Sequence, residues 1–154
     1  MSHYLIIQVD DNHIKKDDRI NVVNVCEDPL FNMKADWGGE EVEDEEKAFE
    51  KIRKTFKRIA TVNKKKRTIT FKKRETVRKI YSDELERIFN ESRAKAKQGR
   101  LDHSMLGLEL DEILGIDDLV YKDYCMTAGN IITDYLNGYT DRVQHVGAIL
   151  DAHF

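Results

Sequence analysis

The sequence has one proline and eight glycines in 154 residues, too few for flexible linkers or a disordered chain. No apolar run approaches the roughly 18 residues that a membrane-spanning helix needs. Two cysteines, Cys26 and Cys125, are far apart in sequence, which argues against a disulfide framework or a cysteine-based zinc site. The N-terminal residues lack the basic start and cleavage site of a secretory signal. These absences favour a cytoplasmic protein with two reduced thiols.

Charge is abundant and unevenly distributed. Charged residues make up 36% of the chain and hydrophobic residues 40%, which predicts one globular domain over residues 1–154 with a real core. The net charge of −3 conceals an acidic segment at 1–50, a basic segment at 51–100 and an acidic segment at 101–154. This order indicates either a basic face for an anionic partner or neutralisation between the segments.

The first half of the chain contains the clearest strand and helix patterns. Residues 3–11 and 19–29 are rich in β-branched residues and predict two neighbouring strands, whereas 30–42 predicts an irregular loop. A helix is predicted from residue 41 to 62, where Phe49, Ile52, Phe56 and Ile59 recur at helical spacing. Its acidic first turn and basic last turns complement the helix dipole. A short strand is then predicted at 67–71.

Residues 76–81 fit two interpretations. As a strand they would pair with 67–71 to form a basic ribbon; as a helix they would join the helix predicted at 83–97, which ends at Gly99. The ribbon is the favoured interpretation. Three more helices are predicted in the last third: a short one within 104–124, one from Val120 to Asn137-Gly138, and one capped by Thr140. The expected fold is therefore α+β, with a small N-terminal antiparallel sheet or hairpins and a packed, acidic, helical C-terminal half.

The basic segment is the strongest candidate for a binding site. Residues 51–79 contain 14 basic side chains and one acidic side chain, Glu75. Such surfaces bind phosphate backbones by releasing condensed counterions. Two basic clusters flank the strand at 67–71, roughly 17 Å apart at about 3.3 Å per residue. The candidate nucleic-acid-binding residues are Lys64, Lys65, Lys66, Arg67, Lys72, Lys73, Arg74, Arg78 and Lys79.

Three other interpretations of this segment stay open. It can be a docking site for an acidic protein surface, a solvated run that protects a sheet edge, or a surface neutralised by the acidic termini. Phe71 lies within the run as a candidate base-stacking residue, but it shares a strand face with Ile69, which favours core packing.

No motif in the sequence clearly indicates a catalytic site. A magnesium-dependent nuclease site could in principle be formed by Asp10, Asp11, Asp36, Glu45 and Lys47, but almost any chain with this many charges would allow one. A helical metal-dependent nucleotide hydrolase would need a second carboxylate pair in addition to Glu109 and Glu112, and none follows at matching spacing. Asp102, His103 and Ser104 are adjacent, whereas the members of a catalytic triad converge from separate elements. No phosphate-binding loop or nucleophile elbow is present. The sequence predicts no cofactor and no metal.

The expected function is a non-enzymatic, nucleic-acid-associated accessory or regulatory protein that contacts phosphates through 51–79. The alternative is a protein-binding inhibitor or adaptor of the phage or mobile-element type that blocks a nucleic-acid-processing enzyme; a metal-dependent nuclease comes third. The leucine- and isoleucine-rich run from Leu106 to Ile116 is predicted to pack mostly in the core; any part of it that stays exposed between the acidic residues suits a protein partner or self-association through the C-terminal half.

Overall fold

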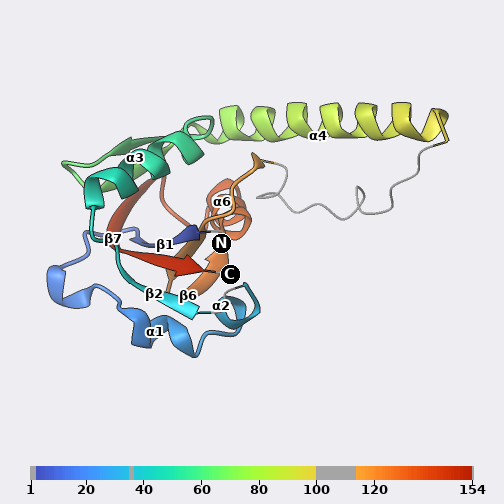
Figure 1. Cartoon of the computed structure of the whole chain (residues 1–154). Coiled ribbons are helices and arrows are strands. Elements are labelled where there is room, and N and C mark those ends of the chain that lie inside the picture. The colour runs from blue at the N-terminus through green and yellow to red at the C-terminus, as the bar shows by residue number, and fades with distance from the viewer. Residues whose placement is uncertain (1–2, 35–36, 100–113, 154) are drawn as a thin grey trace.

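The computed structural model describes residues 3–34, 37–99 and 114–153. Over these residues the chain forms one mixed sheet covered on both faces (Figure 1). The strands are β1 (His3–Asp10), β2 (Trp37–Glu41), β3 (Ala60–Asn63), β4 (Thr68–Phe71), β5 (Leu119–Lys122), β6 (Tyr124–Thr127) and β7 (Val143–His153). The helices are α1 (Val22–Cys26), α2 (Pro29–Lys34), α3 (Glu45–Phe56), α4 (Arg74–Lys97) and α6 (Ala128–Leu136), with a 3-10 turn at Lys16–Asp18.

The strand order is β3-β4-β7-β1-β5-β6, and β2 also pairs with β7. Strand β7 lies at the centre of the sheet: β1 flanks one side, while β4 and β2 pair with its two halves on the other. Only the β1–β5 pair is parallel among the described pairs. The prediction of a small N-terminal sheet followed by a helical half is therefore wrong.

The two faces of the sheet bury different helices. Leu5, Ile7 and Val9 of β1 share one core cluster with buried residues of α3 and α6, and with Val77 of α4. The alternate residues Tyr4 and Ile6 pack in a second cluster with Val25 of α1 and Phe31 of α2. This alternation along β1 is the period of two expected of a strand, and both faces of β1 are apolar because both are covered.

The N-terminal predictions are partly confirmed. Strand β1 and helix α3 occur where the sequence predicts them, and Phe49, Ile52 and Phe56 of α3 are buried. The strand predicted at 19–29 is wrong, because Asn21 and Asn24 form a capping box that starts helix α1. The loop predicted at 30–42 instead contains α2 and β2. Residues 60–62, predicted as the end of the helix, instead belong to strand β3.

The favoured ribbon at 76–81 is also wrong. Strand β4 pairs with β3 and β7, and residues 76–81 belong to α4, which begins at Arg74 and continues to Lys97. Gly99 follows α4 with a φ of +76°, a left-handed conformation that glycine adopts without strain. The helix predicted from Val120 to Asn137-Gly138 is only partly correct. Its second part is α6, with Asn137 as the C-cap, but its first part forms strands β5 and β6.

The helix predicted after Thr140 is strand β7. Val143, Val146 and Leu150 suit helical spacing, but a β-bulge at residues 147–148 interrupts the alternation that would have revealed a strand. Thr140 is buried and bonds to other side chains rather than capping a helix. Most of the run from Leu106 to Ile116 lies outside the described residues, although Ile116 itself is buried in the core.

None of the described helices has the length and apolar character that a membrane-spanning helix requires.

The two cysteines are free thiols: Cys26 is exposed and Cys125 is buried. Burial, with a contribution from nearby Asp28, raises the pKa of Cys125 to about 12. That thiol is therefore protonated and unreactive at neutral pH.

Candidate functional site: the basic hairpin and the acidic pocket

The turn between β3 and β4 carries the first basic cluster. The side chain of Asn63 accepts a hydrogen bond from the Lys66 amide at 2.9 Å, and the Arg67 amide donates to the Lys64 carbonyl at 3.1 Å. Arg67 completes the turn with a φ of 52°. This tight turn leaves Lys64, Lys65 and Lys66 exposed at its tip.

Arg67 points the other way, into the sheet. Its Nε donates to the Val146 carbonyl at 3.2 Å, and an Nη donates to the Gly147 carbonyl. The same guanidinium forms an ion pair with Glu45 at the start of α3 and lies 5.4 Å from the centre of the Phe49 ring. Only 20% of its side chain is exposed. Arg67 therefore holds the hairpin, β7 and α3 together.

The carbonyls that Arg67 binds belong to the bulge in β7. Where β7 departs from the ladder with β1, the Ala148 amide donates to the Gln8 side chain at 3.0 Å. A Cβ on Gly147 would lie 2.3 Å from the Gln8 side-chain oxygen, so glycine is needed for this close approach. Gln8 also accepts from the Ile20 amide and donates to the Asp18 carbonyl.

Two further arginines bind the end of α6. Nε of Arg74 donates to the Tyr135 carbonyl at 2.8 Å, and its guanidinium lies over the Tyr135 ring. Arg78 donates to the Leu136 carbonyl at 2.6 Å. The last carbonyls of a helix lack partners within the helix and carry its negative dipole end, so these contacts join α4 to α6.

The nine predicted residues thus fall into two groups. Arg67, Arg74 and Arg78 bond to backbone carbonyls, while Lys64 pairs with Glu46 and Lys79 with Asp83. The remaining four form no ion pair with any described residue: Lys65, Lys66, Lys72 and Lys73. Lys72 is half-buried and the other three are exposed. We call these four residues the lysine surface.

Phe71 is not available for base stacking. It is 2% exposed and stacks on Tyr135, with ring centres 4.8 Å apart. The prediction that it packs in the core is confirmed.

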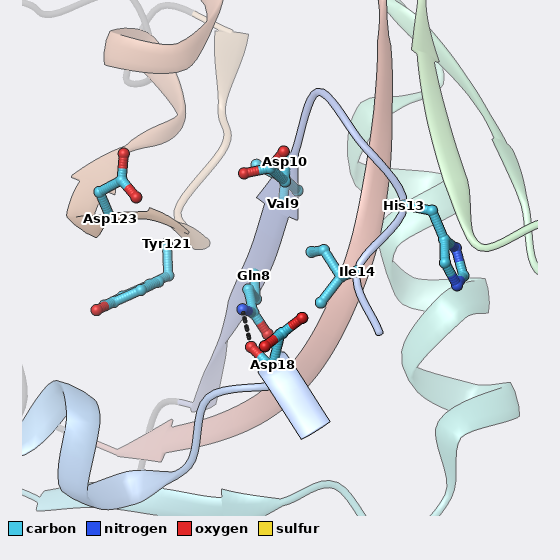
Figure 2. Close-up of a pocket in the computed structure, with 8 residues that line it drawn as sticks. All are labelled: Gln8, Val9, Asp10, His13, Ile14, Asp18, Tyr121 and Asp123. Carbon is cyan, nitrogen blue, oxygen red and sulfur yellow. Dashed lines mark hydrogen bonds between the residues drawn. The ribbon is translucent and has the colours of Figure 1, made fainter. Parts of the chain in front are cut away.

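A second charged site lies at the end of the parallel pair β1–β5. A pocket of about 310 Å³ is lined by Gln8, Val9, Asp10, His13, Ile14, Asp18, Tyr121 and Asp123. Figure 2 shows Asp10 at the end of β1 and Asp123 beyond β5, with His13 turned away from the carboxylates across the connecting loop. Ligands of open α/β sheets often bind at the carboxyl ends of parallel strands. The pocket was not predicted from the sequence, in which only the Asp10-Asp11 pair at the end of a buried strand indicates it.

Beside the pocket, Asp11 organises the end of the sheet. One of its carboxylate oxygens accepts hydrogen bonds from Gln144 at 2.7 Å, Lys122 at 2.9 Å and the Asp141 amide at 3.0 Å. Burial raises the pKa of Asp11, but the bonds from Gln144, Asp141 and Lys122 and the charge of Lys122 outweigh it and lower the pKa from 3.8 to about 2. Lys122 also bonds to Thr140. Asp11 is therefore ionised and fully engaged at neutral pH.

The structure does not assemble the carboxylates considered for a nuclease. Asp11 is bonded to Lys122, Glu45 to Arg67, and Lys47 to Asp44. Within the described ranges no group of three His, Cys, Asp or Glu residues could hold a metal ion. Asp36, the Asp102-His103-Ser104 run, Glu109 and Glu112 lie outside those ranges.

No protein-family model matches this sequence, and neither the curated proteins nor the solved structures provide a significant match.

Proposed function

We propose that this protein binds the phosphate backbone of a nucleic acid through the lysine surface. The observation that supports the proposal is the separation of roles within the basic segment: the arginines bond to the protein's own carbonyls, whereas Lys65, Lys66, Lys72 and Lys73 have no carboxylate partner among the described residues. Unpaired lysines are hydrated point charges that exchange readily between water, counterions and phosphate.

The placement of these lysines suits a linear polyanion. Lys65 and Lys66 lie at the tip of the hairpin, and Lys72 and Lys73 lie at the other end of β4, where α4 begins. Strand β4 between them, Thr68–Phe71, covers about 13 Å at about 3.3 Å per residue. This length corresponds to about four base-pair steps of a duplex at 3.4 Å each. Because Arg67 and Arg74 fix both ends of β4, the two clusters are held at this separation.

The Lys72–Lys73 cluster has a basic neighbour in the turn after α3. The Lys72 amide donates to the Ile59 carbonyl at 2.8 Å, which brings this turn, with the exposed Lys57, beside the start of α4. Arg58, next to Lys57, is paired with Glu84 of α4 at 2.7 Å. The turn after α3 therefore repeats the same pattern: Arg58 forms an ion pair, while the neighbouring Lys57 forms none with a described residue.

The test is a fluorescence-anisotropy titration with labelled duplex DNA, duplex RNA and single strands over a series of salt concentrations. Four phosphate contacts predict a slope of log affinity against log salt of about −3.6 on duplex DNA. The Lys65→Gln/Lys66→Gln variant should lose about half of that slope. Its matched control is Lys15→Gln/Lys16→Gln, which removes the same charge from exposed residues beside the 3-10 turn and should bind as the wild type does.

A slope near zero, or equal losses in both double variants, would contradict the proposal. Comparing the DNA and RNA titrations also identifies the preferred nucleic acid. Because the four lysines bond to no described carboxylate, their replacement should leave the thermal unfolding midpoint unchanged, which separates loss of binding from loss of fold.

A second candidate is an adaptor or inhibitor that binds a nucleic-acid-processing protein. It is favoured by two exposed aromatic residues: Tyr124 is 61% exposed and follows Asp123 of the acidic pocket, and Tyr139 is 79% exposed and precedes Thr140, which bonds to Asp11. Exposed tyrosines next to a charged pocket are typical of protein interfaces. A partner that survives nuclease treatment and is lost in a Tyr124→Ser/Tyr139→Ser variant would support this candidate over the first.

A further inference from the structure

Helix α4 is far longer than its attachment to the domain requires. Its 24 residues extend about 36 Å at 1.5 Å per residue. The first part is anchored: Val77 is fully buried, Ile80 packs against the core, and Glu84 pairs with Arg58 of the turn after α3 at 2.7 Å. Figure 1 shows the remainder, drawn in yellow-green to yellow, running beyond the sheet and its other helices. We call residues 83–97 the outer half of α4.

The outer half carries apolar side chains on one side. Leu85 lies three residues before Ile88 and four before Phe89, so the three side chains share a helix face. Phe89 is 55% exposed. Leu85 and Ile88 are half-buried, yet in the described part of the chain neither belongs to a core cluster nor packs against one. Phe89 thus adds an exposed aromatic ring to an apolar face that no described core cluster covers.

The charges of the outer half are also separated along the helix. Its beginning carries Asp83, Glu84 and Glu86, its middle carries Arg87 and Glu91, and its end carries Arg93, Lys95 and Lys97. Asp83 and Glu84 already form ion pairs within the chain, so Glu86 is the acidic residue of the beginning that pairs with no described residue. Two copies placed antiparallel would bring the acidic beginning of each helix against the basic end of the other. Two parallel copies would bring like charges together, which destabilises a helix pair.

We infer that α4 is a dimerisation element: the outer halves of two copies of this chain pack antiparallel, with a two-fold axis close to Phe89. The surface is then self-complementary in both respects that an isologous interface requires, because the apolar face meets itself and opposite charges face each other. The helix dipoles are also opposed in this arrangement, which is the favourable orientation. This inference is independent of nucleic-acid binding.

Self-association is tested by sedimentation velocity over a hundredfold range of protein concentration, without nucleic acid. The wild type should pass from monomer to dimer, and Phe89→Glu should raise the dimer dissociation constant at least tenfold. Val23→Glu is the matched control, because Val23 is a 70% exposed apolar residue on α1, away from α4. Circular dichroism should show the same helix content for both variants. A wild type that stays monomeric throughout the range, or equal effects of the two variants, would overturn the inference.

Charge reversal tests the facing pairs. Arg93→Glu/Lys95→Glu and Asp83→Lys/Glu86→Lys should each self-associate more weakly than the wild type, because each gives the outer half a large net charge of one sign, negative in the first variant and positive in the second. Mixed in equal amounts, the two variants should recover dimers. Failure of the mixture to associate would contradict the charge pairing.

The direction of the helices is measured with a spin label at position 97 in a Cys26→Ser/Lys97→Cys variant, in which the other cysteine, Cys125, is buried. In the antiparallel dimer position 97 of one copy lies near position 83 of the other. The two labels should then be about 20 Å apart, from the 1.5 Å rise per residue. A separation of about 10 Å, the spacing of parallel helices in contact, would overturn the antiparallel arrangement.

Discussion

The basic hairpin turn and the acidic end of β1 lie on opposite sides of β7, and each holds that strand with one charged residue. On the β4 side, Arg67 donates to the carbonyls of Val146 and Gly147. On the β1 side, Asp11 accepts from Gln144 and from the Asp141 amide just before the strand. In both places the charged residues next to it in the sequence have a different role: Lys65 and Lys66 face solvent, and Asp10 lines a pocket.

This comparison shows that a run of like charges in the sequence need not have one role. A charged side chain that is partly buried stays charged only where it meets several hydrogen-bonding partners, as Arg67 and Asp11 do. Their neighbours remain hydrated and are available to other molecules. The two anchors should therefore differ sharply from their neighbours in stability measurements, and from each other in their response to pH.

The largest effect is expected for Arg67→Ala. The change removes two hydrogen bonds from a charged donor and leaves the bulge carbonyls without that partner, which should cost about 3 kcal/mol of unfolding free energy. The corresponding fall in melting temperature is about 6–12 °C for a chain of this size. Lys66→Ala, one residue away, should change the unfolding free energy by less than about 0.5 kcal/mol. Equal losses in the two variants would remove the distinction between anchor and surface; urea unfolding measures both.

A somewhat smaller loss is expected for Gly147→Ala, which perturbs the bulge rather than its anchor. The added Cβ would lie 2.3 Å from the Gln8 side-chain oxygen, so β7 or Gln8 must shift. Overpacking of this kind costs about 1–3 kcal/mol. Ala148→Gly, at the next position, keeps the amide that bonds to Gln8 and serves as the control. If Gly147→Ala unfolds at the same urea concentration as the wild type, the bulge tolerates a side chain and the proposed close packing is wrong.

Low pH should specifically weaken the hydrogen bonds and the ion pair that Asp11 forms. Its pKa is lowered from 3.8 to about 2 in the fold, so the unfolded chain takes up the proton first. The stability that Asp11 contributes is therefore present above about pH 4 and is lost as the pH falls toward 2. Because Asp11 is 29% exposed, this contribution is at most about 2 kcal/mol. Asp11→Asn should flatten this part of the pH profile of unfolding, and a profile that keeps its wild-type shape in this variant would contradict the role of Asp11.

The smallest effect, and one of opposite sign, is expected at Asp118. Burial raises the pKa of this carboxyl, against the hydrogen bond from the Leu5 amide and the charge of Lys51. The unfolded chain releases its proton more readily than the fold does, so ionised Asp118 lowers stability above its folded pKa. Asp118→Asn keeps an acceptor for Leu5 and should raise stability at neutral pH by up to about 1 kcal/mol. A clear loss at neutral pH would show instead that the Lys51–Asp118 pair is stabilising.

The sequence predicted the elements that local patterns determine. Strand β1 has β-branched residues on both faces, and α3 has a single apolar stripe with complementary charges at its ends. The second half of α4 and the end of α6 were also correct, because Gly99 and Asn137-Gly138 are local stop signals.

The remaining elements depend on contacts distant in sequence. Strand β7 is buried on both faces and interrupted by a bulge, so neither a period of two nor one of 3.6 describes it. The start of α4 is fixed by Arg74 and Arg78 bonding to α6, some 60 residues away, rather than by a capping side chain. The same limit applied to the candidate site: lysines and arginines are equivalent in a charge count, and only the carbonyls of Val146, Gly147, Tyr135 and Leu136 distinguish them.

The position of β7 has a consequence for how the chain folds. The last of the described strands to be synthesised is the one that joins β1 to β4 and β2, so the first 142 residues contain the pieces of a sheet without its centre. Pairs such as His3 with His153 close very long loops, a topology that makes folding slow. During synthesis β1 would expose an unpaired edge until β7 leaves the ribosome, and that interval is when aggregation or chaperone capture should compete with folding.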